Sequence, residues 1–247
     1  MKQMIWKELR ELEVGSNISW LYVPAGVVRF FGGRRRLYFE STDFLVFISF
    51  TASLGGFAFG LIQGYRESAQ DRWAFLLHRA AANQIAAAKL LVGCGIQFVC
   101  WVTLLVGSAL YLKLNNSFNH PFYWFTLLPA LLVSLVFVPM YALGLLFFIW
   151  KTRRKIVKPM ILGFVLSTWM TLASLPPSVG WSGLWGMAFS LAVLTLLSIS
   201  AFLASYRSYG ELESAGLPSR LFLHSGVVVT LTAVFMIVAQ LVNSMVT

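Results

Sequence analysis

The sequence has few charged residues. Asp, Glu, Lys and Arg make up 11% of its 247 residues, whereas a soluble domain carries about 25%. Hydrophobic residues account for 58% of the chain and aromatic residues for 15%. This composition excludes a disordered chain and a collagen-like fibre, and it is far from that of a water-soluble enzyme. It predicts a protein that crosses a membrane several times.

Cysteine is almost absent, and acidic residues are scarce. Cys94 and Cys100 lie in one apolar segment, which excludes a disulfide framework, and two thiols alone are a poor metal site. Lys and Arg outnumber Asp and Glu by 19 to 9. In a soluble protein this excess would suggest nucleic acid. In a membrane protein it is typical of cytoplasmic loops, so we predict no nucleic-acid partner.

The motifs of common catalytic and phosphate-binding sites are missing. No Gly is followed by Lys, which excludes a phosphate-binding loop of the GxxxxGK[ST] type. There is no HExxH, and no Ser has the context of a nucleophile elbow. His78, His120 and His224 are scattered, and loop or interface positions account for them. We therefore predict no catalytic residue, metal or cofactor in the chain itself.

Long apolar segments are what the sequence does contain. Each reaches or approaches the roughly 20 residues that a helix needs to cross the hydrocarbon. Their backbone groups must pair internally in lipid, and they lack the alternation of barrel strands. We predict an all-α fold, a polytopic transmembrane helix bundle of six to seven spans. The segments without Asp, Glu, Lys or Arg are 44–64, 90–112, 122–150, 159–177, 183–205 and 221–247.

A shorter apolar segment, 18–28, is the candidate for the seventh span. It contains Pro24 and precedes Arg29, and its length alone favours an interfacial or re-entrant segment. If it crosses, fourteen Lys and Arg residues lie on one side and four on the other; if it does not, the N-terminal region alone places seven basic residues opposite eleven. The positive-inside rule favours the crossing. We therefore predict a multi-pass protein of the cell membrane with a cytoplasmic N-terminus.

The six long segments lack the ionisable residues on which ion-coupled transporters commonly depend. This disfavours ion-driven secondary transport, and any uphill transport would draw its energy from outside the chain. Gln63, Gln97 and Gln240 either line a polar path or pair between helices. Proline is expected to kink the helices or to end them at the membrane face; the positions are Pro129, Pro139, Pro176 and Pro177.

Residues 1–16 form a unit ahead of the transmembrane domain, 17–247. Ile5, Leu9 and Leu12 recur at helical spacing, with charges on the other face. This pattern predicts an amphipathic helix that lies along the cytoplasmic membrane surface. A solvated helix without a function is the alternative.

The polar stretch 65–89 separates the first two long segments. Its content of Ala, Leu and Gln gives it high helix propensity. Trp73, Leu76, Leu77 and Ala80 form an apolar stripe, and charged residues flank it. We predict a short helical hairpin at the membrane face that docks a partner. A connector that contacts only lipid headgroups is the alternative.

Gly56, Gly60 and Gly64 recur every fourth residue in the first long segment. A helix face of such small residues allows a second helix to approach closely. The sequence alone leaves two candidates for that neighbour, a helix of the same chain or a helix of a second copy.

Two stretches resemble the permease subunits of ABC-2-type ABC transporters. The opening MIWKELRE is similar to the start of the connecting helix of these proteins. GLIQGYRESAQDRWAFLLHRAAANQIAAAKLLVG is similar to the stretch that follows their second span. Two details depart from the family pattern: Ala80 replaces a usual Pro, and Ala82 and Asn83 replace a Ser-Arg pair. A seven-span count also differs from the common plan of six helices.

The resemblance implies a permease that encloses a path together with a second copy or a homologue. A separate ATP-binding cassette subunit would bind ATP and dock on the cytoplasmic face. The coupling residues that the resemblance implies are Glu67, Arg72, Trp73, Leu76 and Arg79. A membrane scaffold that moves nothing is the alternative, and a lipid enzyme using His78 or His224 is a weaker third.

Overall fold

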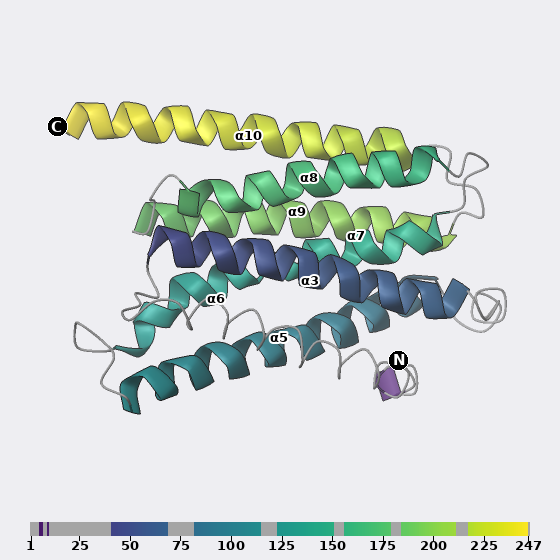
Figure 1. Ribbon diagram of the computed structural model, residues 1–247. Helices are drawn as coiled ribbons and strands as arrows, with labels where there is room; N and C mark the ends of the chain where they lie inside the picture. The colour runs from purple at the N-terminus through teal and green to yellow at the C-terminus, as the bar shows by residue number, and fades with distance from the viewer. Residues whose placement is uncertain are drawn as a thin grey trace.

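The computed structural model describes residues 5–6, 9, 41–68, 82–114, 123–150, 156–178, 184–210 and 217–246. In these ranges the chain forms α-helices and one 3-10 helix, η1, and no strand. The predicted all-α helix bundle is therefore confirmed (Figure 1). The elements are α3 (Thr42–Ser68), α5 (Ala82–Leu114), η1 (Trp124–Leu127), α6 (Leu128–Ser134), α7 (Phe137–Ile149), α8 (Val157–Ser178), α9 (Leu184–Gly210) and α10 (Leu217–Val246).

Six of the described helical stretches are long and apolar enough to cross a membrane, as the six apolar segments predict. The predicted seventh span, 18–28, lies outside the described residues and stays a prediction. The candidate spans are Thr42–Tyr65, Gln84–Leu114, Trp124–Ile149, Val157–Pro176, Gly186–Ala204 and Leu217–Val242. The chain is thus a multi-pass membrane protein.

The six spans alternate in direction, so the same end of the bundle gathers every second junction. We call this the connector end: there α3 ends and α5 begins, α7 ends and α8 begins, and α9 ends and α10 begins (right in Figure 1). The sequence places its strongly basic stretches, 65–89 and 151–158, at these junctions. The alternation therefore gathers most of the basic residues at one end of the bundle.

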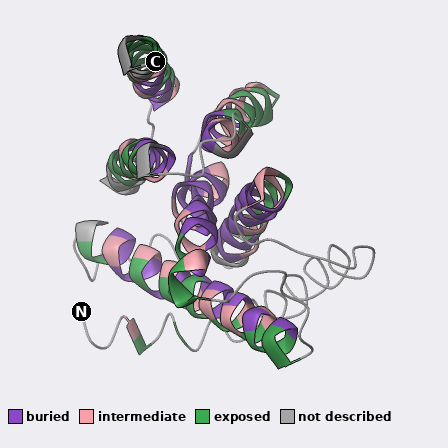
Figure 2. Cartoon of the chain, turned by 90° about the vertical axis from the view of Figure 1, so that its left-hand side faces the viewer, coloured by how far each residue is buried: buried purple, intermediate pink, exposed green. Residues whose placement is uncertain are grey.

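Helix α7 lies at the centre of the bundle. It contacts α3, α5, α8 and α9, and its side chains Met140, Leu143 and Leu146 are fully buried. Figure 2 shows the buried residues in the middle of the bundle and the exposed ones on its outer helices. Helix α10 lies at the edge, where it packs on α8 and α9. Outward apolar side chains of this kind are expected for a helix bundle in lipid.

The third span is broken between α6 and α7, at Leu135 and Val136. Pro139 explains the break, because proline has no N–H to donate to the carbonyl four residues earlier, that of Leu135. The N–H of Val138 donates to this carbonyl instead, at 3.0 Å, and the N–H of Leu135 donates to the carbonyl of Leu132 at 3.1 Å. These shorter-range bonds tighten the turn. The expectation that proline bends or ends helices also agrees with Pro129 at the start of α6 and with Pro176 and Pro177 in the last turn of α8.

Helix α5 crosses the bundle obliquely (Figure 1). Its candidate span, Gln84–Leu114, has 31 residues and is about 46 Å long at the helical rise per residue. The hydrocarbon core is only about 30 Å thick. A helix of this length must tilt or extend beyond the hydrocarbon, and the slant of α5 relative to its neighbours agrees with that requirement.

The backbones of α3 and α7 meet along the glycine face of α3. A Cβ at Gly56 would lie 2.6 Å from the Phe137 carbonyl oxygen, and one at Gly60 would overlap the carbonyl oxygen of Tyr141. On α7, Gly144 faces Gly60 in the same way, since a Cβ there would overlap the carbonyl of Phe57. The neighbour of this glycine face is therefore a helix of the same chain.

We predict that Gly60→Ala lowers the stability of the protein by about 2 kcal/mol, because the added methyl group forces α3 and α7 apart. Gly95→Ala is the control, since a Cβ at exposed Gly95 on α5 has no atom within 4 Å. That change should be neutral or stabilising by up to about 1 kcal/mol, owing to helix propensity. Unfolding experiments in detergent measure the stability of both variants against the wild-type protein. Equal stability of the two would contradict the close contact of α3 and α7.

Candidate functional site

The predicted coupling residues surround the junction between α3 and α5. Glu67 lies in the last turn of α3, although its side chain is outside the described residues. Arg72, Trp73, Leu76 and Arg79 also lie outside them, within 69–81. Their coupling role stays a prediction. The structure does describe the two helices that hold this stretch, and both extend into the predicted connector 65–89.

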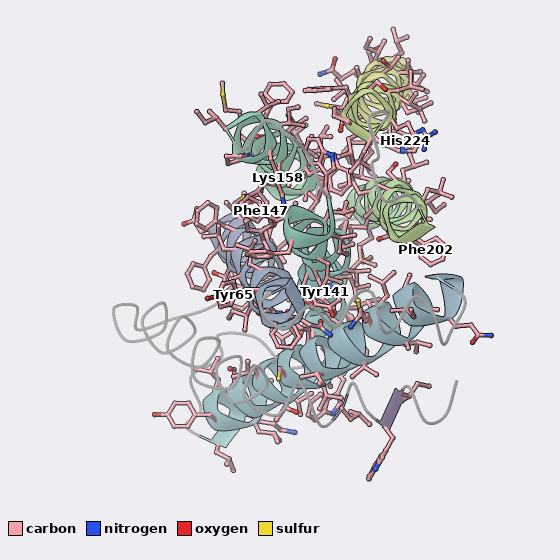
Figure 3. All side chains as sticks on the ribbon, turned by 90° about the vertical axis from the view of Figure 1, so that its right-hand side faces the viewer. Tyr65, Tyr141, Phe147, Lys158, Phe202 and His224 are labelled. Carbon is pink, nitrogen blue, oxygen red and sulfur yellow. The ribbon has the colours of Figure 1, made fainter. Side chains whose placement is uncertain are left out.

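A buried polar junction joins these two helices to α7. The hydroxyl group of Tyr141, on α7, donates a hydrogen bond to Oε1 of Gln63 on α3. The same hydroxyl group lies 3.1 Å from the backbone carbonyl oxygen of Lys89 on α5. Gln63 is 5% exposed, and Tyr141 and Lys89 are fully buried. One side chain at the centre of the bundle therefore contacts both helices that flank the connector (Figure 3).

Apolar residues enclose this junction. Phe59, Ile85, Val92 and Leu145 form a buried cluster around Tyr141, and the Phe59 and Tyr141 rings lie 5.6 Å apart between centroids. The three residues are thus shielded from the surroundings of the bundle. In such surroundings, removing the hydrogen-bond partner of a buried polar group lowers the free energy of unfolding by about 1–3 kcal/mol.

Gly93 explains how the tyrosine ring fits against α5. A Cβ at this position would overlap the ring and hydroxyl atoms of Tyr141. The absence of a side chain on α5 thus makes room for the ring, and it brings the hydroxyl group within reach of the Lys89 carbonyl one turn earlier. A close approach of this kind is a general reason for glycine within a helix.

The position of Lys89 differs from the prediction, because the predicted apolar segment 90–112 begins after it. The candidate span Gln84–Leu114 includes it, because α5 continues through the Ala-rich sequence ahead of the apolar segment, where helix propensity is high. The other charged residues of the candidate spans, Asp43, Lys113, Lys158 and Arg220, lie near helix ends. Lys89 is fully buried. A buried ionisable residue in a membrane protein is costly and commonly marks a functional position.

A second set of contacts holds the end of α3. The rings of Tyr65 and Phe148 meet edge to face, with 5.7 Å between centroids, and a Cβ at Gly64 would lie 3.0 Å from the Phe148 ring. Lys158 of α8 places its ammonium group 5.0 Å from the centroid of the Phe147 ring. This distance is typical of cation–π contacts. The last turn of α3 before the connector is thus packed against α7, which in turn contacts the start of α8.

The predicted N-terminal helix is described only at Ile5, Trp6 and Leu9, and all three are helical. Ile5 packs against the cluster that encloses Tyr141, while Trp6 is 73% exposed. One face of this short stretch therefore contacts the bundle at the connector end. Contact with a membrane surface stays a prediction.

The remaining sequence candidates do not assemble into a reactive site. Of the three glutamines, Gln63 pairs with Tyr141, Gln97 is buried, and Gln240 is exposed at the end of α10. His224 lies on α10 and is half-buried, with its Nδ1 atom unpaired, whereas His78 lies outside the described residues. The described part of the chain holds no group of three His, Cys, Asp or Glu residues that could bind a metal ion.

Sequence reasoning did not find Tyr141, and it placed Lys89 at the end of the polar connector 65–89 rather than in the interior of the bundle. Tyr141 occupies the third apolar segment, and nothing in that segment distinguishes it from an interface aromatic residue. Gln63 gave the one usable signal, because a glutamine within an apolar span must find a polar partner.

We predict that Tyr141→Phe lowers stability by about 1 kcal/mol, because it leaves the amide of Gln63 and the Lys89 carbonyl without the hydroxyl group. Tyr123→Phe, which removes a hydroxyl group from a side chain that is 53% exposed, is the matched control and should be neutral. Unfolding by SDS titration in mixed micelles measures both variants. In a Gln63→Leu background the Tyr141→Phe change should cost less. An identical cost in both backgrounds would show that the hydroxyl group does not pair with Gln63.

Comparisons with known proteins leave the function to be argued from this geometry. The chain matches no family model, no curated protein and no solved structure.

Proposed function

We propose that the chain is the transmembrane permease subunit of an ABC-2-type transporter, which a separate ATP-binding cassette subunit drives through the connector 65–89. The resemblance of residues 1–13 and 60–93 to that family suggests the assignment. The observation that carries it is the polar junction, because Tyr141 contacts both helices that flank the connector. A force on the connector would therefore reach the centre of the bundle directly.

The proposed mechanism depends on rigid contacts. α3 and α7 meet backbone to backbone at Gly56 and Gly60, so they move together, since close-packed interiors transmit displacement. ATP binding in the partner subunit would favour one position of the connector, and release of the products of hydrolysis the other. Reversing a two-state equilibrium from 1:99 to 99:1 requires about 5.5 kcal/mol of differential binding. The connector and its two helices would transmit this free energy.

The distribution of basic residues indicates the face of the membrane on which the proposed ATPase subunit would dock. The connector end holds the stretches 65–89 and 151–158, with nine Lys and Arg residues between them. The positive-inside rule assigns such an end to the cytoplasm, where ATP is available. The N-terminus would lie on the same side, and the protein would be a component of the cell membrane.

The pathway itself would form between two permeases. The exposed apolar side chains of α5 and α10 would face lipid or a second copy, because helix association in lipid depends on packing. ATP would bind only in the partner subunit, and the permease would carry no cofactor and catalyse no reaction of its own.

The orientation gives a direct test. We expect a cysteine placed at Gln70 to be protected from an impermeant maleimide in intact cells and to react after the cells are opened. The background must lack Cys94 and Cys100, both of which are free thiols on α5. A cysteine at Asn119, in the sequence between the end of α5 and the start of η1, should react in intact cells. The reverse pattern would place the connector outside and reject the coupling role.

The coupling role gives a second test. Trp73→Asp with Leu76→Asp should reduce transport-linked ATP hydrolysis at least tenfold while insertion and folding are retained, because two buried charges would prevent docking. The matched control is Trp181→Asp with Leu184→Asp. It changes the same residue pair at the same spacing, in the sequence that leads into α9, and should leave coupling intact. The measurement is substrate-stimulated ATPase activity of the complex purified in mild detergent.

Two outcomes of this test would reject the proposal. One is unchanged coupling in the Trp73 and Leu76 variant. The other is the absence of a stoichiometric ATP-binding protein from the purified wild-type chain, even after ATP and vanadate have been added to trap the complex. That second result would favour a scaffold that assembles other membrane proteins without transport.

A further inference from the structure

A groove of about 480 Å³ runs between α9 and the α5–α7 side of the bundle. Its floor is buried and consists of Leu194 and Ala201 of α9 and Ala142 of α7. Its rim on α9 is exposed and includes Ile199 and Phe202. Phe202 projects from α9 toward α5 in the view from the connector end (Figure 3). The groove is therefore open along one side of the bundle.

The medium outside this opening is hydrocarbon. Every lining residue lies within a candidate membrane span, and the lining is almost entirely aliphatic and aromatic. Thr195 donates its hydroxyl group to the Leu191 carbonyl of its own helix at 2.7 Å, so it needs no polar partner in the groove. Water occupies such a cavity only where polar groups hold it. The chemistry of the lining therefore requires an apolar occupant.

The dimensions distinguish a chain from a helix. The lining on α9 extends from Leu191 to Leu203, a length of about 18 Å at the helical rise. Dividing the volume of about 480 Å³ by this length gives a cross-section of about 27 Å². A helix with side chains is about 10 Å wide, which corresponds to about 80 Å². A single hydrocarbon chain, with contacts at about 4 Å, occupies about 20 Å² and fits.

The position of the groove along the membrane indicates the leaflet. Leu203 is next to Ala204, the connector-side end of the fifth candidate span, whereas Leu191 lies five residues inside the other end, Gly186. The groove therefore begins at the connector-side interface and ends inside the hydrocarbon. Its length of about 18 Å is close to half of the roughly 30 Å hydrocarbon core, which is the reach of one leaflet.

We propose that this groove holds one acyl chain of a phospholipid from the leaflet at the connector end. Contacts on several sides would hold that chain more firmly than the chains that surround the rest of the bundle. The proposal does not depend on the transport function, because it follows from the lining, the dimensions and the membrane position of the groove alone.

The test uses the full chain in nanodiscs of phosphatidylglycerol and phosphatidylcholine. The probe is a phosphatidylcholine with a photoactivatable diazirine in the middle of one acyl chain, and mass spectrometry maps the labelled residues. We expect labelling around Ala201 and Ala142 to exceed that of the exposed face of α8 at least threefold. Thr195→Phe with Ser198→Phe narrows the groove and should reduce this labelling at least threefold.

The chain provides a matched control for the narrowing variant. Thr168→Phe with Thr171→Phe also replaces two hydroxyl side chains three residues apart by Phe, but on α8, where both hydroxyl groups bond to their own helix. It should leave groove labelling unchanged. Thr195→Leu with Ser198→Leu is a milder second variant that should reduce labelling if the Phe variant does not fold. Size-exclusion chromatography identifies the variants that fold.

Three results would overturn the proposal. They are equal labelling of the groove and of the exposed face of α8, labelling that persists in both folded narrowing variants, and cross-links from the groove to a second copy of the chain. The first would show only the ordinary lipid that surrounds any membrane protein. The last would show that a helix of a partner occupies the groove.

Discussion

The contact between the backbones of α3 and α7 is the constraint on which the rest of the bundle depends. Gly60 and Gly144 face each other, and neither position has room for a side chain. Lipid tails are as apolar as leucine, so helices in a membrane gain little from hiding apolar surface and associate through close packing. The contact brings Gln63 next to Tyr141, a hydrogen bond that a wider separation would not allow. The polar junction is thus a consequence of the glycine face.

The centre and the edge of the bundle differ in how closely their helices are packed. The centre of the bundle is closely packed, since most residues of α7 are buried and the helix contacts four long helices. Its periphery has fewer contacts, since α10 packs on two neighbours and exposes most of its described side chains. A closely packed centre next to the connector suits a protein that changes shape when a partner acts on it, which is the role we propose.

The sequence was sufficient to predict the spans but insufficient for their partners. A helix that crosses lipid must be long and apolar, and both properties are local, so segments such as 44–64 could be read directly. Which helices pack together is not a local property. The glycines of α3 indicate a close contact, but nothing near them in the sequence identifies α7 as the neighbour. Lys89 was placed in a polar connector because hydropathy does not register that an Ala-rich helix continues into it. Tyr141 was missed because one hydroxyl group barely changes the character of an apolar segment.

The slant of α5 has a mechanical consequence. Tyr141 touches α5 near Lys89, and 25 residues separate that point from Leu114, a distance of about 38 Å along the helix axis. The arm on the connector side, back to Ala82, is only about 10 Å long. If α5 turned about its contact with Tyr141, the two arms would move unequally: a swing of about 10° would shift the short end by about 2 Å and the long end by about 7 Å. A small push at one face of the membrane would thereby become a movement the width of a side chain at the other.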